Sequence, residues 1–141
     1  MKKAIYVFAL ILLFINGIGA LFGGWGLIGD PTGTSMGWTT AMLQHSLFND
    51  YLIPGIILFT ANGLSSLIIA FFTIRKNSFY PQLIMIQGYI LSGWIIIQIL
   101  MIRQVHMLHF ICGIIGVSLI SAGIALIVSR PKKVNFRRQS L

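Results

Sequence analysis

Few residues in this chain have side chains that could do chemistry. Its 141 residues include two acidic side chains, Asp30 and Asp50, three histidines and no glutamate. His106 and His109 are three residues apart, so a helix would project both from one side, and with His45 or an aspartate they could bind a metal ion. Two histidines at this spacing match no recognised metal motif. We therefore expect no metal site and predict interfacial or hydrogen-bonded histidines, with a proton-responsive or ligand-contacting role as the alternative.

Catalysis has little support in the residue types present. Glutamate, a lysine inside an apolar stretch and a Gly-x-Ser-x-Gly elbow are all absent from the sequence, so the usual acids, bases and nucleophiles are scarce. The single cysteine, Cys112, cannot form a disulfide or a two-cysteine redox relay within one chain. We expect no catalytic residues and no cofactor. The remaining enzymatic alternative is a minimal site formed by a histidine and an aspartate, on the side of the protein that faces away from the cytoplasm.

Four long apolar stretches must position these side chains. The composition, 57% hydrophobic and 9% charged with a mean hydropathy of +0.91, lies outside the usual range of soluble proteins. A membrane span needs about 20 mainly apolar residues. The sequence predicts one membrane domain, 1–141, of fold class all-α: an antiparallel four-helix transmembrane bundle with spans over 4–28, 51–75, 81–102 and 107–129. The second span is expected to begin at a cap formed by Asn49 and Asp50.

Lysine and arginine residues predict the orientation of the bundle, because cytoplasmic segments retain them. If four spans alternate, every basic residue except Arg103 falls on one side: Lys2, Lys3, Arg75, Lys76, Arg130, Lys132, Lys133, Arg137 and Arg138. Both termini are thus predicted to be cytoplasmic and the loop 29–50 to lie outside. The basic tail 130–141 follows a span directly, where anionic lipid attracts it. The net charge of +8 therefore predicts contact with membrane lipids and not with nucleic acid.

Each span carries small and polar residues along one face, at helical spacing. These faces comprise Ala9, Asn16, Gly19, Ala20 and Gly23; Gly55, Asn62, Ser65, Ser66 and Thr73; Gln87, Trp94 and Gln98; and His106, His109, Gly113, Gly116 and Gly123. In the first interpretation the glycines let backbones approach and the polar groups hydrogen-bond across helices. In the second, Asn16 and Asn62, both near mid-membrane, line a path for a polar or amphipathic ligand.

Polar side chains also gather at the outer end of the predicted bundle. Asp30 and Asp50 fall on the side where Arg103 is the only fixed positive charge, so a salt bridge between Arg103 and one aspartate is predicted. The first loop begins with the turn-forming run Gly29–Gly33. After it, Trp38–Phe48 is predicted to form a short helix on the membrane surface, with Trp38, Ala41, Met42, His45 and Phe48 on one face.

The run SLFNDYLIPG at 46–55 resembles a segment of small, uncharacterised bacterial four-span membrane proteins. The runs GDPTG at 29–33 and GWIIIQ at 93–98, with Arg103 and His109, fit the same pattern. This resemblance covers almost the whole chain and implies a bacterial inner membrane, but no activity. Small multidrug exporters depend on a glutamate in the first span. Fluoride channels carry a glycine-rich, arginine-containing pattern in the first span, and quinone-linked disulfide enzymes need cysteine pairs. The chain lacks all three features.

The leading hypothesis is a non-enzymatic module that binds a small amphipathic molecule, a lipid or a membrane partner in an outward-facing recess bounded by the first loop. The predicted ligand contacts share a position at the outer end of the spans: Asp50, Trp94, Gln98, Arg103, His106 and His109. A homo-oligomeric channel or transporter, with Asn16 and Asn62 along its path, is the alternative. A membrane enzyme with a His–Asp site is the third hypothesis.

Overall fold

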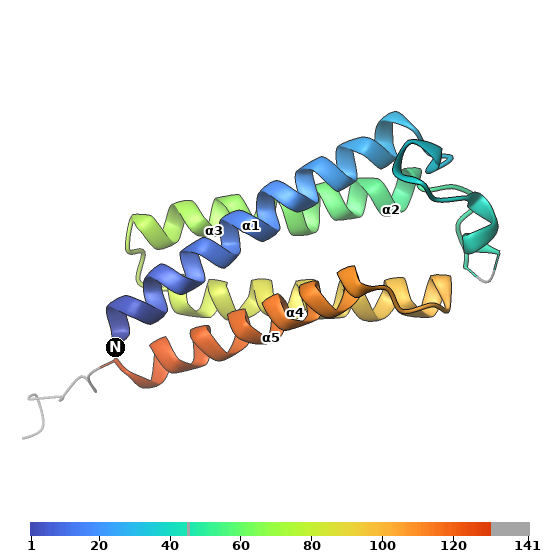
Figure 1. Cartoon of the computed structure of the whole chain (residues 1–141). Coiled ribbons are helices and arrows are strands. Elements are labelled where there is room, and N and C mark those ends of the chain that lie inside the picture. Colours follow the sequence, from blue (N-terminus) through green and yellow to red (C-terminus); the bar gives the residue numbers. More distant parts are fainter. Residues whose placement is uncertain (45, 131–141) are drawn as a thin grey trace, which may run out of the picture.

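The protein is an all-α bundle in which successive membrane spans run antiparallel (Figure 1). The structure, a computed structural model, describes residues 1–44 and 46–130. Within these residues, four helices are long and apolar enough to cross a membrane: α1 (Lys2–Gly29), the continuous helix Leu52–Ile74, α4 (Tyr80–Ile102) and α5 (Met107–Val128). These helices confirm the four predicted spans, and the chain is a polytopic membrane protein.

The second span changes its helical geometry halfway along. It consists of α2 (Leu52–Ile57), the π-helix η3 (Leu58–Leu64) and α3 (Ser65–Ile74). A π-helix bonds each amide one residue further back than an α-helix does, and such segments occur frequently at functional sites. Two residues of η3 are buried, Asn62 and Gly63, and Gly63 faces Leu21 of α1. The sequence carries no signal that predicts this change.

Glycines bring the helices together in two pairs. Between α1 and the second span, a Cβ added to Gly24 would lie 2.8 Å from the carbonyl oxygen of Gly55. Between α4 and α5, a Cβ added to Gly88 would lie 2.7 Å from the carbonyl oxygen of Gly116. Both contacts allow close backbone approach, as predicted for small residues in membrane bundles. The predicted close approach at Gly19 is wrong, since nothing lies within 4 Å of a Cβ there and the residue faces outward.

Among the described residues, two of three apolar clusters divide the core along the bundle axis, and the third, formed by Leu27, Leu43 and Tyr51, joins the first loop to the helices. The first joins α1, α3, α4 and α5 through fully buried Ala9, Leu13, Ala70, Ile84 and Leu119. The second contains Leu91, Trp94 and Ile95 of α4, packed against Ile57, Leu58, Ile99, Cys112 and Ile115. Along the second span and α4, the polar side chains of Asn62, Ser65, Ser66 and Gln87 lie between the first two clusters in sequence, and Asn16 of α1 hydrogen-bonds to Ser66. The polar groups therefore form a layer across the middle of the bundle.

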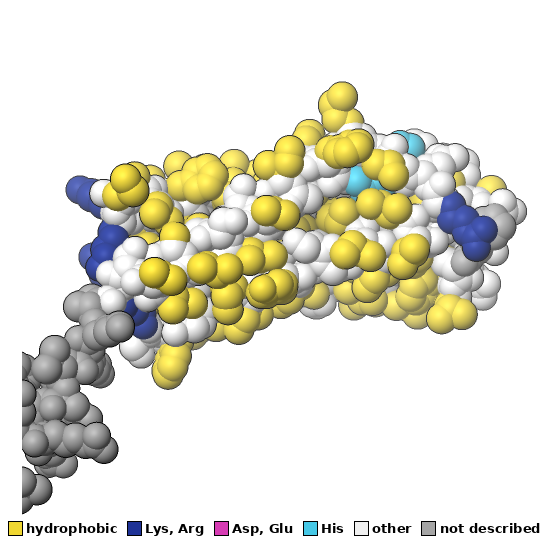
Figure 2. All heavy atoms as spheres, turned by 90° about the horizontal axis from the view of Figure 1, so that it is seen from below, with side chains coloured by type: hydrophobic (Ala, Val, Ile, Leu, Met, Phe, Trp, Pro, Cys, Tyr) yellow, Lys and Arg dark blue, Asp and Glu magenta, His cyan; other side chains and the backbone are white. Residues whose placement is uncertain are grey.

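The two ends of the bundle differ in charge. The N-terminus and the last described residue, Arg130, lie at one end, which we call the terminal end, and the loop 30–51 lies at the other, the first-loop end (Figure 1). Figure 2 shows lysine and arginine confined to the ends, with apolar side chains covering the length between them. At the terminal end Arg75, Lys76 and Arg130 lie over the rings of Phe71, Tyr6 and Tyr80 at 5.5, 5.8 and 5.6 Å. Residues 131–141 of the predicted basic tail are outside the described part of the chain.

The first loop is held by hydrogen bonds around Asp30 rather than by a long surface helix. The Asp30 carboxylate accepts hydrogen bonds from the Thr32 hydroxyl and from the backbone amide of Ser35, and these bonds lower the pKa of Asp30. Two short 3-10 helices follow, η1 (Thr34–Met36) and η2 (Thr40–Leu43). The helix predicted over Trp38–Phe48 is present only as the single 3-10 turn η2, because Thr39 is extended, with its carbonyl oxygen bonded to the Tyr51 hydroxyl. His45 lies outside the described residues.

Candidate functional site

Tyr51 fixes the first loop to the start of the second span. Its side chain is 2% exposed, its hydroxyl donates to the carbonyl oxygen of Thr39 at 2.8 Å, and burial raises the pKa of the phenol. The Tyr51 backbone amide donates to the carbonyl oxygen of Pro31, also at 2.8 Å. Its ring packs on Trp38 with 5.5 Å between the ring centroids. Trp38 is therefore positioned by a buried aromatic side chain, although it belongs to a loop.

The connection between α4 and α5 is tight and is capped by two histidines. Arg103 ends α4 in the left-handed conformation, at φ 56°, with its amide donating to the carbonyl oxygen of Ile99 at 2.8 Å. At the start of α5 the backbone amide of His106 donates to Nδ1 of His109 at 3.0 Å. The backbone amide of His109 donates to the backbone carbonyl oxygen of His106, also at 3.0 Å. These two bonds join the first turn of α5 to its N-cap residue.

A recess of about 390 Å³ lies between the first loop and this connection. The volume is within the range of about 300–1,000 Å³ that is usual for small-molecule sites. One part of its lining is apolar and comes from Met36, Trp38, Met42, Ile102 and Leu108, with Gly37. The other part is polar and comes from Gln98, His106 and His109. We call this space the main recess.

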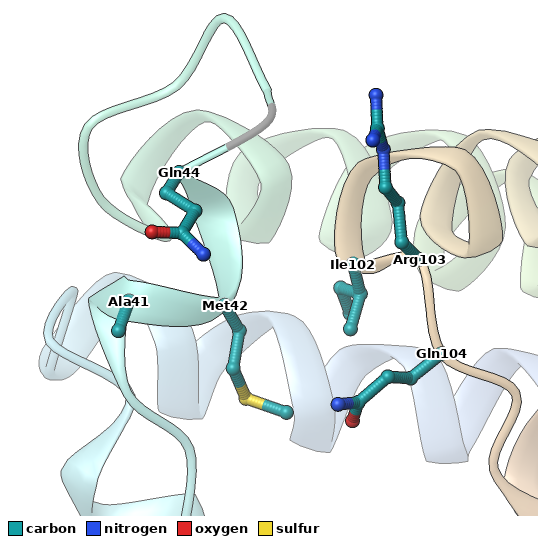
Figure 3. Close-up of a pocket in the computed structure, with 6 residues that line it drawn as sticks. All are labelled: Ala41, Met42, Gln44, Ile102, Arg103 and Gln104. Carbon is teal, nitrogen blue, oxygen red and sulfur yellow. The ribbon is translucent and has the colours of Figure 1, made fainter.

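A second hollow of about 320 Å³ adjoins the main recess and shares Met42 and Ile102 with it. We call it the side lobe, and its other lining residues are Ala41, Gln44, Arg103 and Gln104 (Figure 3). In this view Met42 and Gln104 point toward one another across the opening, and the Arg103 side chain extends away from them. The two hollows together form a continuous concave surface that is apolar on the loop side and polar at the α4–α5 connection.

The structure brings four of the six predicted ligand contacts to this surface. Gln98, His106 and His109 line the main recess, and Arg103 lines the side lobe. Trp94 lines neither hollow, because its side chain is 6% exposed and packs in the core cluster of α4. Asp50 lines neither hollow either. Its carboxylate accepts the backbone amide of Leu52 at 3.0 Å, but the N-cap residue of the second span is Tyr51, one residue after the predicted cap Asn49–Asp50.

The predicted salt bridge to Arg103 is not formed between residues that the structure describes. Asp30 and Asp50 each hydrogen-bond within their own segment of the first loop. The side chain of Arg103 is exposed beside the side lobe. Among residues 1–44 and 46–130, no carboxylate lines either hollow.

Sequence reasoning missed most of the apolar lining. Trp38 and Met42 were predicted to share an apolar face, but on a helix lying along the membrane surface. Met36, Ile102 and Leu108 carried no signal, because an apolar residue near the end of a span is as easily explained by contact with lipid. Their role depends on how the loop folds back over the α4–α5 connection, which spacing along the chain does not reveal.

The polar layer at mid-bundle supports the structural interpretation for Asn16. Its Nδ2 donates to Oγ of Ser66 at 2.6 Å and to the backbone oxygen of Asn62 at 3.4 Å, so it joins α1 to the second span. Likewise Ser65 donates to Oε1 of Gln87 at 2.7 Å and joins α3 to α4. The side chain of Asn62 is fully buried, and neither polar atom of its amide has a partner among the described residues. A path along Asn16 and Asn62 stays a prediction.

Within residues 1–44 and 46–130, no three histidine, cysteine or acidic side chains are grouped so that they could hold a metal ion. Searches against protein-family models, curated proteins and solved structures find no match for this chain. The chemistry of the main recess and the side lobe therefore provides the best basis for a functional hypothesis.

Proposed function

We propose that this protein is a non-enzymatic membrane module that binds a small amphipathic molecule in the main recess. The single observation that carries the proposal is a hollow of about 390 Å³ with an apolar wall on one side and amide and imidazole groups on the other. We further propose that it resides in a bacterial inner membrane with its termini in the cytoplasm. The clustering of basic residues at the terminal end supports that orientation, which directs the recess outward.

The apolar wall suits a flexible hydrocarbon group. Met36 and Met42 have unbranched, polarisable side chains that adapt to irregular partners, and Trp38 offers a large flat surface that Tyr51 holds in place. A volume of about 390 Å³ corresponds to roughly a dozen water molecules at about 30 Å³ each. Release of such waters from an apolar wall by a hydrocarbon chain is favourable.

The recess also borders the surface that faces lipid. Leu108 lines the main recess while remaining 59% exposed, and its neighbour Met107 is 78% exposed. An amphipathic molecule dissolved in the bilayer would therefore meet the recess at this edge. The polar lining from Gln98 and the histidines lies where the helices end, so its head group would stay near the membrane surface.

The arrangement of the histidines favours binding over catalysis. Nδ1 of His109 accepts the His106 amide, and both aspartates hydrogen-bond within the first loop. No His–Asp pair is formed among the described residues, so the imidazole has no carboxylate to orient it as a base. The arrangement of His106 and His109 therefore supports the binding hypothesis over the enzyme hypothesis.

Photo-crosslinking tests the proposal directly. The full-length protein is placed in nanodiscs of phosphatidylcholine and exposed to a medium-chain alcohol that carries a diazirine at the chain terminus, and the labelled peptides are mapped. We expect labelling of the loop around Met36–Met42 and of the α4–α5 connection, and we expect an excess of the unmodified alcohol to suppress it. Trp38→Ala should reduce the labelling severalfold.

Trp25→Ala is the matched control, because Trp25 is 69% exposed on the lipid-facing side of α1 and does not line the recess. Labelling spread evenly over the lipid-facing helices, with no suppression by competitor and no dependence on Trp38, would overturn the proposal.

A further inference from the structure

The polar side of the concave surface offers hydrogen-bond donors and no carboxylate. We infer that the amphipathic ligand carries an anionic oxygen head group, a carboxylate or a phosphate, which binds at the α4–α5 connection between His106, His109 and Arg103. This inference rests on the proposed function and specifies the class of ligand. It follows from which atoms are already occupied in the protein.

His109 presents a donor to the main recess. Because its Nδ1 accepts the backbone amide of His106, the neutral imidazole must carry its proton on Nε2. Nε2 has no hydrogen-bond partner among the described residues and is not one of their fully buried polar atoms. Since His109 is only 7% exposed and lines the main recess, the open space that Nε2 reaches is the recess itself.

His106 adds a second donor. Every tautomer of an imidazole carries at least one N–H group, and the His106 side chain lines the main recess. The centroids of the His106 and His109 rings are 5.7 Å apart. Two imidazoles in one recess suit a head group with more than one acceptor oxygen.

Arg103 supplies the positive charge: its exposed side chain extends away from Met42 and Gln104 in Figure 3 and turns toward the head group when the ligand binds. Its left-handed backbone conformation, uncommon for a residue other than glycine, turns the chain so that Arg103 and Gln104 border the side lobe while His106 and His109 border the main recess. A guanidinium group pairs well with planar or tetrahedral oxyanions. With no carboxylate in the described lining, a cationic head group would find no opposite charge there, only the Trp38 ring and the amide oxygens of Gln98 and Gln104.

The test compares three competitors of equal chain length against the diazirine alcohol described above: an alkyl phosphate, the alkyl alcohol and an alkyltrimethylammonium. Competitor concentrations are expressed as mole fractions in the nanodisc, so that differences in partitioning do not enter. Hydrogen bonds to a charged group are stronger than those between neutral groups. We expect the alkyl phosphate to suppress labelling at about tenfold lower mole fraction than the alcohol, and the ammonium compound to be the weakest competitor.

Substitutions at Arg103 sharpen the comparison. Arg103→Gln should remove most of the advantage of the phosphate over the alcohol, whereas Arg103→Lys should retain part of it because the charge remains. Arg75→Gln is the matched control, since Arg75 lies at the terminal end of the bundle. An equal loss in Arg75→Gln would overturn the assignment to Arg103.

The outcomes separate the two claims. Equal competition by all three compounds would overturn the anionic head group and leave the proposed function standing, whereas absence of specific labelling would overturn both. Nanodiscs containing phosphatidylglycerol identify the source of the anion. Suppression by this lipid alone would assign a membrane lipid, and suppression only by the added alkyl phosphate would assign a free amphiphile.

Discussion

Replacing Gly33 by alanine is expected to loosen the first loop from the second span, and Gly37→Ala provides an internally matched comparison. The two glycines have nearly the same backbone conformation, at φ +76° and +74°, so alanine at either position incurs a similar left-handed penalty. Their surroundings differ. A Cβ at Gly33 would lie 2.8 Å from a ring carbon of Tyr51 and 3.0 Å from Cβ of Trp38, whereas nothing lies within 4 Å of a Cβ at Gly37.

The expected magnitudes follow from these two terms. The left-handed conformation costs a non-glycine residue about 1–2 kcal/mol, and overpacking against a fixed side chain adds about 1–3 kcal/mol. Gly37→Ala should incur only the cost of the left-handed conformation, whereas Gly33→Ala should incur this cost and the cost of overpacking. The difference of about 1–3 kcal/mol corresponds to roughly a fivefold to hundredfold larger opening equilibrium for the Gly33→Ala loop.

Amide hydrogen exchange measures this opening. The backbone amide of Trp38 donates to Gly33 at 2.9 Å and that of Tyr51 donates to Pro31 at 2.8 Å, so both become exchangeable when the loop detaches. We expect faster exchange at both amides in Gly33→Ala, with exchange in α5 unchanged. Tyr51→Leu by itself should loosen the loop, because it removes the bond to Thr39, but adding Gly33→Ala to it should accelerate exchange little beyond the left-handed penalty, because the ring that the new Cβ would meet is gone. Equal acceleration in the two single variants would refute the reasoning.

Three further predictions concern the bundle and the loop. Asn16→Leu should destabilise the protein by about 1 kcal/mol, because its buried partner Ser66 loses a hydrogen bond. Asn62→Leu should destabilise it less, or stabilise it, because the Asn62 amide has no partner among the described residues. Thermal unfolding in detergent measures both effects, and a larger loss of stability in Asn62→Leu would contradict the structural role given to Asn16. Gly88→Ala should cost about 1–3 kcal/mol in the same assay by separating α4 from α5, while Gly113→Ala, with open space at its Cβ, should be neutral. The lowered pKa of Asp30 means that its carboxylate stabilises the folded loop at pH above the unfolded value of about 3.9 and loses that effect as the pH falls through the folded value. Tryptophan fluorescence should report this acid transition, and Asp30→Asn should abolish it.

The sequence predicted the spans well because their signal is strong and local. A run of apolar residues with few charges has no other stable environment, so the limits of α1 and α4 follow closely from composition. The inward positions of Asn62, Gln87 and Gly116 also followed from helical spacing. Any other rotation of these helices would have turned their polar side chains toward lipid.

The first loop and the details of packing could not be predicted in the same way. Spacing placed Gly19 on an inward face, but the crossing of α1 over the second span selects Gly24 instead. The amphipathic pattern after Trp38 suggested one helix, yet the chain is shaped by the buried ring of Tyr51 and by the extended backbone of Thr39. Both outcomes depend on contacts between segments distant in sequence.

The unequal lengths of the membrane helices have a consequence for the lipid environment. At a rise of about 1.5 Å per residue, the 28 residues of α1 extend about 42 Å and the 22 residues of α5 about 33 Å, against a hydrocarbon core of about 30 Å. To immerse its apolar length, α1 must tilt more steeply than α5, and it crosses the bundle obliquely from α5 toward α2 (Figure 1). Because the first loop follows α1 directly, bilayer thickness sets the height of Trp38 above the α4–α5 connection, so we expect thicker and thinner membranes to change how widely the main recess opens.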